Sequence, residues 1–153
     1  MNFEIKEVKN LSGEKAHIYS VILDGDSKTL LEQFFDENAK YRRDVKKILN
    51  KILVMANDTG CRRQYFKEGE GALGDGVVAI DKTGCLRLYG IYFHNAVVLF
   101  GSGGYKPPGV VAYQDYAPLN AKAQQVKKIA KIINQMIIDK ELIINEDGTL
   151  NIY

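Results

Sequence analysis

A charged residue inside an apolar stretch is the first feature of this sequence that could do chemistry. Arg87 lies between Leu86 and Leu88, in a run of Leu, Tyr, Ile and Phe that predicts a strand over residues 86–93. A guanidinium in such a place needs a partner or a ligand, because burying an unpaired charge is costly. Lys106 is the next cation along the chain. Both side chains can bind a phosphodiester and stabilise negative charge that develops on it.

Further cations and phenols occur in the same middle part of the chain. Lysine and arginine bind phosphate groups, and tyrosine rings can stack on unpaired bases. The candidate set is Arg62, Arg63, Tyr65, Lys67, Tyr89, Tyr105 and Tyr113. Each residue also has a purely structural interpretation, since loop arginines can simply be solvated and strand tyrosines can fill a sheet.

The net charge of +2 hides an uneven distribution. Residues 1–37 contain four Lys or Arg and eight Asp or Glu, which gives −4. Residues 38–131 contain sixteen and seven, which gives +9, and residues 132–153 contain one and four, which gives −3. A basic middle between acidic ends indicates a positive face that suits a polyanionic partner. The alternative is a helix surface that is charged only because it is solvated.

The elements that position these side chains follow from hydrophobic periodicity. Residues 86–93 and 96–101 are expected to pair through a tight turn at His94-Asn95, because Asn tolerates a positive φ. Residues 58–76 are rich in glycine and charge and are expected to form a loop. Other strands are expected at residues 3–8 and 17–23, as an opening hairpin, at 77–80, and in a closing hairpin around Asp147-Gly148.

Three helices are expected. The first has Asp26 or Ser27 as its N-cap, and the third runs from Pro118 or Asn120 to about Lys140. The second, roughly residues 41–57, combines an apolar stripe with a basic face that includes Arg43 and Lys47. The order of elements predicts an α+β fold in a single domain, residues 1–153, with helices packed on one face of a twisted antiparallel sheet.

The sequence does not support several common kinds of nucleotide-binding or metal-binding site. Gly69–Gly74 matches G-x-G-x-x-G but precedes a strand, and Glu68 and Glu70 would repel a phosphate. Gly101–Lys106 lacks the spacing of a P-loop. Cys61 and Cys85 form no metal-ligand pattern, and the sequence has only two histidines. No metal and no cofactor are therefore expected.

The hydropathy of the chain bears on its location. No run of about 18 apolar residues occurs, so no membrane-spanning helix is expected. The opening residues are charged and alternating, unlike a signal peptide. We expect a cytoplasmic protein with no membrane partner.

The succession of elements resembles a known family. A helical pair is followed by Gly74–Ile80, by the strand that bears Arg87, and by the apolar strand Val97–Gly101, which ends near Lys106 and leads to a helix. Over about residues 30–140 this pattern resembles the RelE/HigB-like toxins of bacterial toxin–antitoxin modules, their phage-derived branch in particular. The hairpins at the two ends of the chain are additions to a minimal toxin of this kind.

The resemblance implies a function and a site. It implies a type II toxin that cleaves mRNA on the ribosome as a metal-independent endoribonuclease and is neutralised by a cognate antitoxin protein. Arg87 matches the strand arginine of the family, Lys106 the first lysine after the following strand, and Lys67 the basic residue ahead of these strands. These three are the expected catalytic residues. The remaining candidates, with Arg43 and Lys47, are expected to bind RNA.

Two alternatives stay open. The chain could be a non-catalytic module of the same fold that binds RNA or a protein partner, because Lys106 is followed by Pro107-Pro108 where the family often has Lys-Lys-Thr. It could also be an unrelated small α+β protein with a solvated basic helix. The sequence leaves the oligomeric state, including a homo-oligomer, undecided.

Overall fold

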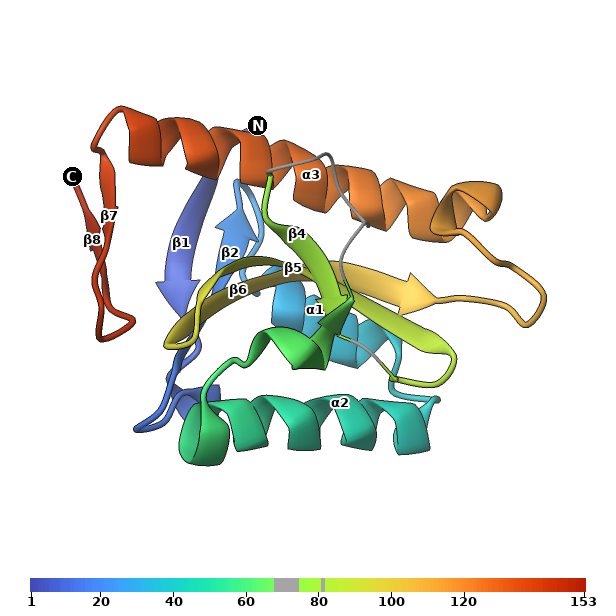
Figure 1. Ribbon diagram of the computed structural model, residues 1–153. Coiled ribbons are helices and arrows are strands. Elements are labelled where there is room, and N and C mark those ends of the chain that lie inside the picture. Colours follow the sequence, from blue (N-terminus) through green and yellow to red (C-terminus); the bar gives the residue numbers. More distant parts are fainter. Residues whose placement is uncertain (68–74, 81) are drawn as a thin grey trace.

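Six strands form the main sheet, in the order β1-β2-β6-β5-β4-β3 (Figure 1). The structure is a computed structural model that describes residues 1–67, 75–80 and 82–153. The Gly69–Gly74 motif and part of the expected loop 58–76 lie outside the described residues. The strands are β1 (Phe3–Glu7), β2 (His17–Leu23), β3 (Phe66–Lys67), β4 (Val77–Ile80), β5 (Leu86–His94) and β6 (Val97–Tyr105).

The α+β class is confirmed, and the sheet, which was expected to be antiparallel, is mixed. Four of the five pairs of neighbouring strands are antiparallel. The exception is β2, which runs parallel to β6, with His17 opposite Val97 and Tyr19 opposite Leu99. The opening hairpin β1–β2 and the hairpin β5–β6 are both present, and the parallel pair joins them into one sheet.

Three α-helices surround the sheet: α1 (Leu30–Glu37), α2 (Arg42–Val54) and α3 (Ala117–Ile138). The first begins later than the sequence indicates, because Thr29 rather than Asp26 or Ser27 is its N-cap. The Thr29 hydroxyl accepts from Glu32 N–H, and the Glu32 carboxylate accepts from Thr29 N–H, which forms a capping box. None of the described helices is long and apolar enough to cross a membrane.

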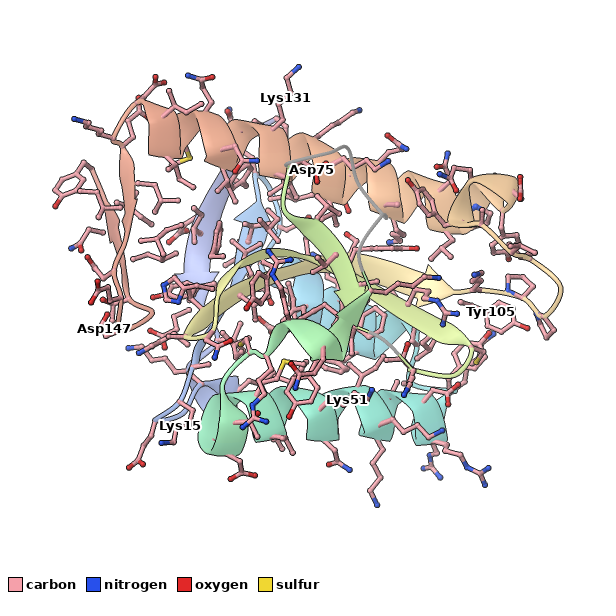
Figure 2. All side chains as sticks on the ribbon, in the orientation of Figure 1. Lys15, Lys51, Asp75, Tyr105, Lys131 and Asp147 are labelled. Carbon is pink, nitrogen blue, oxygen red and sulfur yellow. The ribbon has the colours of Figure 1, made fainter. Side chains whose placement is uncertain are left out.

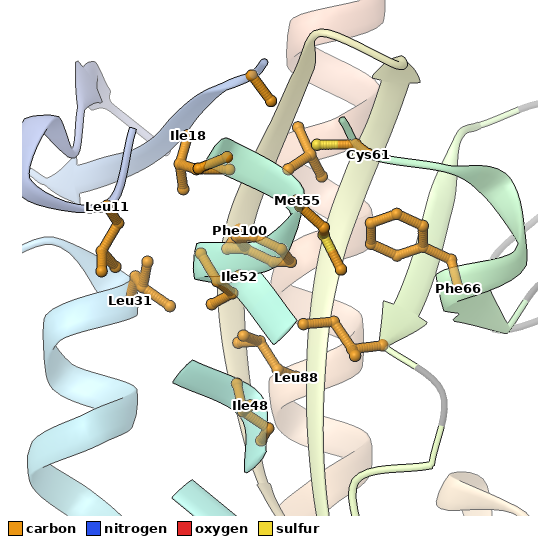
Figure 3. Close-up of a cluster of buried hydrophobic side chains, with 14 of the residues drawn as sticks. Leu11, Ile18, Leu31, Ile48, Ile52, Met55, Cys61, Phe66, Leu88 and Phe100 are labelled. Atoms are coloured by element: carbon orange, nitrogen blue, oxygen red, sulfur yellow. The ribbon is translucent and has the colours of Figure 1, made fainter. Parts of the chain in front are cut away.

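The helices cover both faces of the sheet, so the expectation of helices on one face is wrong. One buried cluster contains Ile48 and Ile52 of α2 together with Leu88 and Phe100 of the sheet (Figure 3). A second cluster contains the apolar stripe of α3, with Val126 and Ile133 among its members. Figure 1 shows α2 and α3 on opposite sides of β5 and β6. We call these the α2 side and the α3 side.

Glycines in β6 let both layers approach the sheet closely. A Cβ added at Gly101 would lie 2.8 Å from Val126 of α3. A Cβ added at Gly103 would lie 2.0 Å from the carbonyl oxygen of Arg87 and 2.9 Å from the Phe34 ring of α1. The glycine-rich stretch after the apolar run is therefore part of the strand and packs beneath the helices.

The closing hairpin is confirmed as a separate two-stranded sheet of β7 (Leu142–Ile144) and β8 (Leu150–Ile152). Within the described residues, two hydrogen bonds connect it to the main sheet. The Leu150 N–H donates to the Tyr19 hydroxyl over 3.3 Å, and His94 Nε2 lies 3.0 Å from the Asn145 carbonyl oxygen.

Candidate anion-binding site

A pocket of about 140 Å³ lies at the β3–β4–β5 end of the strand order, and three cationic side chains line it. They are Lys67 of β3, Lys82 of the β4–β5 turn and Arg87 of β5. Thr83 and Gly84 of the same turn complete one wall. The structure thus brings together two of the three residues expected to be catalytic and adds a lysine. We call Lys67, Lys82 and Arg87 the cationic pocket.

Strand register explains why Lys67 and Arg87 share a face of the sheet. Lys67 pairs with Ala79, and Ala79 pairs with Tyr89, so the three side chains project on the same side. Leu88 belongs to the cluster on the α2 side and Tyr89 to the cluster on the α3 side. Because side chains alternate along a strand, Arg87 projects with Tyr89 toward the α3 side.

The guanidinium of Arg87 is held by backbone rather than by a carboxylate. Its Nη1 donates to the carbonyl oxygens of Gly84 and Leu86, each over 2.8 Å. Among the residues that the structure describes, Nε and Nη2 make no hydrogen bond. The Arg87 guanidinium, which was predicted to need a partner, is therefore half-buried and held in one orientation. Its Nε and Nη2 groups are available to donate to an anion.

The turn that orients Arg87 is fixed by helix α2. Asp44 Oδ2 accepts hydrogen bonds from the Cys85 N–H over 3.0 Å and from the Cys85 thiol over 2.8 Å. Gly84 has a φ of +71°, and a Cβ added there would lie 2.4 Å from Asp44 Oδ1. A glycine is required here both for the backbone conformation and for the close approach of α2.

This contact shifts both pKa values. The hydrogen bond from the Cys85 thiol, followed by the bond from its N–H, lowers the pKa of Asp44. Burial, followed by the hydrogen bond to Asp44, raises the pKa of the Cys85 thiol. Cys85 therefore acts as a neutral hydrogen-bond donor that keeps Asp44 in place, a state that disfavours nucleophilic chemistry.

Lys106 does not line the cationic pocket. Its N–H donates to the Cys85 carbonyl oxygen over 2.7 Å, so its backbone lies near the turn. Its Nζ donates to the carbonyl oxygen of Val111 over 2.7 Å and closes the loop that contains Pro107 and Pro108. The structure thus brings Arg87 together with Lys67 and Lys82 at the pocket and does not bring the Lys106 ammonium there.

Tyr89 and Tyr113 are core residues. Their exposed fractions are 1% and 4%, and their rings contact each other edge to face at a centroid distance of 5.9 Å. Lys127 of α3 donates to the Tyr113 hydroxyl and lies over its ring. Neither ring presents a face on which a base could stack, so the stacking role expected of these two tyrosines does not fit their burial.

Tyr105 is half-buried on the α2 side. Its ring stacks on Tyr41, the N-cap of α2, with a centroid distance of 5.1 Å and an interplanar angle of 7°. Lys40 Nζ lies 5.2 Å from the centroid of the Tyr41 ring. One face of each tyrosine is therefore occupied by the other.

Arg62, Arg63 and Tyr65 immediately precede β3, but they do not line the cationic pocket. Arg63 sits over the ring of Tyr92 at 5.1 Å, and the Tyr65 hydroxyl donates to the Thr59 hydroxyl over 3.1 Å. Tyr92 follows Arg87 by five residues on β5, or roughly 16 Å at about 3.3 Å per residue. These residues are not brought together with the cationic pocket.

The basic face of α2 is present and exposed. Arg43 and Lys47 point to solvent, while Ile48 and Ile52 of the same helix are fully buried. Because Asp44 contacts the β4–β5 turn, the beginning of α2 lies beside that turn. Arg43 is thus at the same end of the molecule as the cationic pocket, and Lys47 lies one helical turn further along.

Lys82 is the one residue of the cationic pocket that sequence reasoning missed. It adopts a positive φ of 57°, which is uncommon for lysine and places it in the tight turn before β5. Lys82 lies between the predicted strands 77–80 and 86–93, and a cation five residues before Arg87 is a signal that could have identified this lysine.

The histidines lie elsewhere. His17 is bonded to Glu7 and His94 to the closing hairpin, and neither lines the cationic pocket. In the described part of the chain, no group of His, Cys, Asp and Glu residues could hold a metal ion. Comparisons with protein-family models, with curated proteins and with solved structures find no match for this chain.

Proposed function

We propose that this protein binds RNA at the cationic pocket and cleaves mRNA on the ribosome, as the toxin of a type II toxin–antitoxin module. The observation that carries the proposal is the convergence of Lys67, Lys82 and Arg87 on one pocket. Cations from two strands and a turn form the kind of site that binds a phosphodiester. The resemblance to RelE/HigB-like toxins supplies the reaction.

The proposed reaction is a transesterification. The 2′-oxygen of one nucleotide attacks the adjacent phosphorus, the bond from phosphorus to the 5′-oxygen breaks, and a cyclic phosphate and a 5′-hydroxyl remain. One proton leaves the 2′-hydroxyl and one reaches the departing 5′-oxygen. Nη1 of Arg87 is held by two backbone carbonyl oxygens, and Nε and Nη2 donate to the charged phosphate oxygens. Lys67 and Lys82 are the pocket residues that transfer protons.

A second function has its own support. The Lys106 ammonium is bonded to the Val111 carbonyl oxygen and does not line the pocket. A site without this lysine suits a non-catalytic module that binds RNA, or an antitoxin-like protein with an acidic segment, through the same three cations.

The test compares variants that remove the pocket with one that removes a distant charge. Expression of the wild-type chain in bacteria is expected to arrest growth and to produce mRNA fragments with 5′-hydroxyl ends. The double variant Lys67→Ala/Arg87→Ala is expected to lose both effects. Lys131→Ala removes an exposed cation on the outer side of α3 and is expected to behave as the wild type (Figure 2).

The outcomes separate the two functions. Unchanged growth arrest by the correctly folded double variant would contradict the proposed site. Absence of cleavage by the wild-type protein, combined with RNA binding that weakens with salt and requires Arg87, would instead establish the non-catalytic module.

A further inference from the structure

The strand at the opposite end of the sheet order from the cationic pocket has an open edge. Among the residues that the structure describes, β1 pairs with β2 and with no other strand. Hydrogen bonds from Val8 N–H to Ile18 and from Asp24 N–H to Asn2 show that the even-numbered residues of this segment bond with β2. The backbone N–H and C=O groups of Phe3, Ile5 and Glu7 therefore point away from β2. An open edge of this kind is a template for another strand.

The side chains of β1 differ between its two sides. Glu4 and Lys6 are exposed and lie on the same side of the strand. Phe3 and Ile5 are half-buried and lie on the other side, against the cluster beneath α3. The strand thus carries one acidic and one basic residue on a face that contributes no side chain to that cluster.

These two charges are arranged for self-pairing. If β1 lies antiparallel to a second β1 with Ile5 opposite Ile5, then Glu4 faces Lys6 of the second copy and Lys6 faces Glu4. We propose that β1 pairs in this register with β1 of a second copy of the chain, forming a twofold-symmetric dimer with a continuous sheet of twelve strands. A twofold interface is closed, so association stops at two copies.

The backbone supports the same register. Residues 3, 5 and 7 carry the outward N–H and C=O groups, so Ile5 opposite Ile5 and Phe3 opposite Glu7 are hydrogen-bonded pairs. Glu4 and Lys6 then form the non-hydrogen-bonded pairs, in which side chains approach most closely. The charged pairs consequently occupy the positions where opposite charges interact best.

There is space beside the strand on the charged side. A groove of about 500 Å³ separates β1 and the residues that follow it from α1. Lys6 and Lys9 lie along one side of the groove, and Leu31, Glu32 and Phe35 of α1 lie along the other. The groove therefore leaves open space beside Lys6, on the side of the strand to which the charged side chains of a second copy would project.

The occupant is a second copy because the charge pattern of β1 is complementary to itself. Charges on an edge strand can also serve only to prevent pairing. Pairing with a different protein would place no constraint on the relation between Glu4 and Lys6. Charge reversal distinguishes these cases.

The experiment measures the dissociation constant of the dimer by sedimentation equilibrium over a range of concentrations. The variants are Glu4→Lys, Lys6→Glu and the double exchange Glu4→Lys/Lys6→Glu. Both residues are exposed, so the monomer fold is expected to be unaffected, which circular dichroism checks. Each single reversal converts two attractive pairs into two repulsive ones and is expected to weaken the dimer by about tenfold or more. The double exchange restores both pairs and is expected to recover wild-type affinity.

Two results would overturn the proposal. One is a wild-type chain that remains monomeric up to millimolar concentration. The other is a dimer in which the double exchange is as weak as the single reversals, because this would place the interface elsewhere. The prediction is independent of the proposed ribonuclease activity, since none of the three variants alters the cationic pocket.

Discussion

The main sheet ends in two edges that carry charge in different ways. At the β3–β4–β5 end, Lys67, Lys82 and Arg87 present charges of one sign around a pocket. On β1, Glu4 and Lys6 present charges of opposite sign on a single strand face. A cluster of positive charges favours an anionic partner. Alternating negative and positive charges on a strand can instead pair with the same strand of a second copy. The arrangement of charge, rather than its amount, distinguishes a ligand site from a self-association surface.

Of the substitutions considered, removal of the Arg87 side chain should have the largest effect, and it tests the role of the cationic pocket. Loss of a preorganised donor to a charged transition state typically costs about 10²–10³ in rate, so Arg87→Ala is expected to slow RNA cleavage about a hundredfold or more. Arg87→Lys keeps the positive charge but loses the planar guanidinium with its paired N–H donors, so this variant should retain only part of the cleavage rate. The measurement is single-turnover cleavage of a model mRNA. An equally large loss of cleavage rate in Lys106→Ala would contradict the interpretation that Lys106 only closes the loop through its hydrogen bond to Val111.

Asp44 tests whether the cationic pocket depends on helix α2. Its pKa is lower in the folded state than in the unfolded chain, so its carboxylate stabilises the fold above about pH 4, and this contribution is lost as the pH falls through the folded-state pKa. Asp44→Asn is expected to reduce the free energy of unfolding by about 1 kcal/mol at pH 7 and by less at pH 3, where part of the carboxylate contribution is lost.

The measurement for this prediction is urea denaturation at the two pH values. Asp58→Asn serves as the control, since Asp58 is an exposed carboxylate in the turn that follows α2. An equal change in the two variants, or a deficit for Asp44→Asn that persists in acid, would show that Asp44 does not clamp the turn.

Lys82 tests whether the third cation contacts phosphate. A lysine that neutralises one phosphate contributes about 0.7 to the slope of log affinity against log salt for a single strand. Lys82→Ala is therefore expected to weaken binding of single-stranded RNA several-fold and to reduce this slope by about 0.7. Fluorescence anisotropy titrations at several salt concentrations measure both quantities. Loss of affinity with an unchanged slope would mean that Lys82 acts only by shaping the turn.

The smallest effect is expected when a substitution at one edge of the sheet is tested for its influence on binding at the other edge. Substitutions at distant sites without shared partners usually act additively. The charge reversals at Glu4 and Lys6 should leave RNA affinity per chain unchanged, and Arg87→Ala should leave the dimer dissociation constant unchanged. Coupling in either direction would show that the two edges form one binding surface.

Much of the fold was accessible from the sequence, because the local signals were strong. Periodicity located the helices to within a few residues, and turn residues identified two hairpins. The first turn lies at Asn95-Ala96, one residue later than the predicted His94-Asn95, and Asn95 does not adopt the positive φ that the prediction invoked. The pairing of β2 with β6 was not accessible, since it joins residues 80 positions apart and leaves no local pattern. The sequence did contain a signal that helices cover both faces of the sheet. Leu88 and Tyr89 are consecutive large apolar residues of β5. A strand that buries side chains on both of its faces must be packed against other elements on both faces.

The candidate site was only partly predictable for a similar reason. Arg87 and Lys67 were identified by residue type, and the register of β3, β4 and β5 places them together. The hydrogen bond that holds the Lys106 ammonium on the Val111 carbonyl oxygen depends on the path of an irregular loop. The burial of Tyr89 and Tyr113 depends on where α3 crosses the sheet. Neither property is encoded by local residue spacing.

The parallel pairing of β2 with β6 also has a consequence for folding during synthesis. At about 5–20 residues per second, roughly 4–16 s separate the synthesis of His17 from that of its partner Val97. Until β6 is complete, the hairpin β1–β2 has both of its edges open. The nascent chain therefore has no partner for the inner edge of β2 during these seconds, and pairing of β2 with β6 closes a contact between residues 80 positions apart, a kind of contact that slows folding.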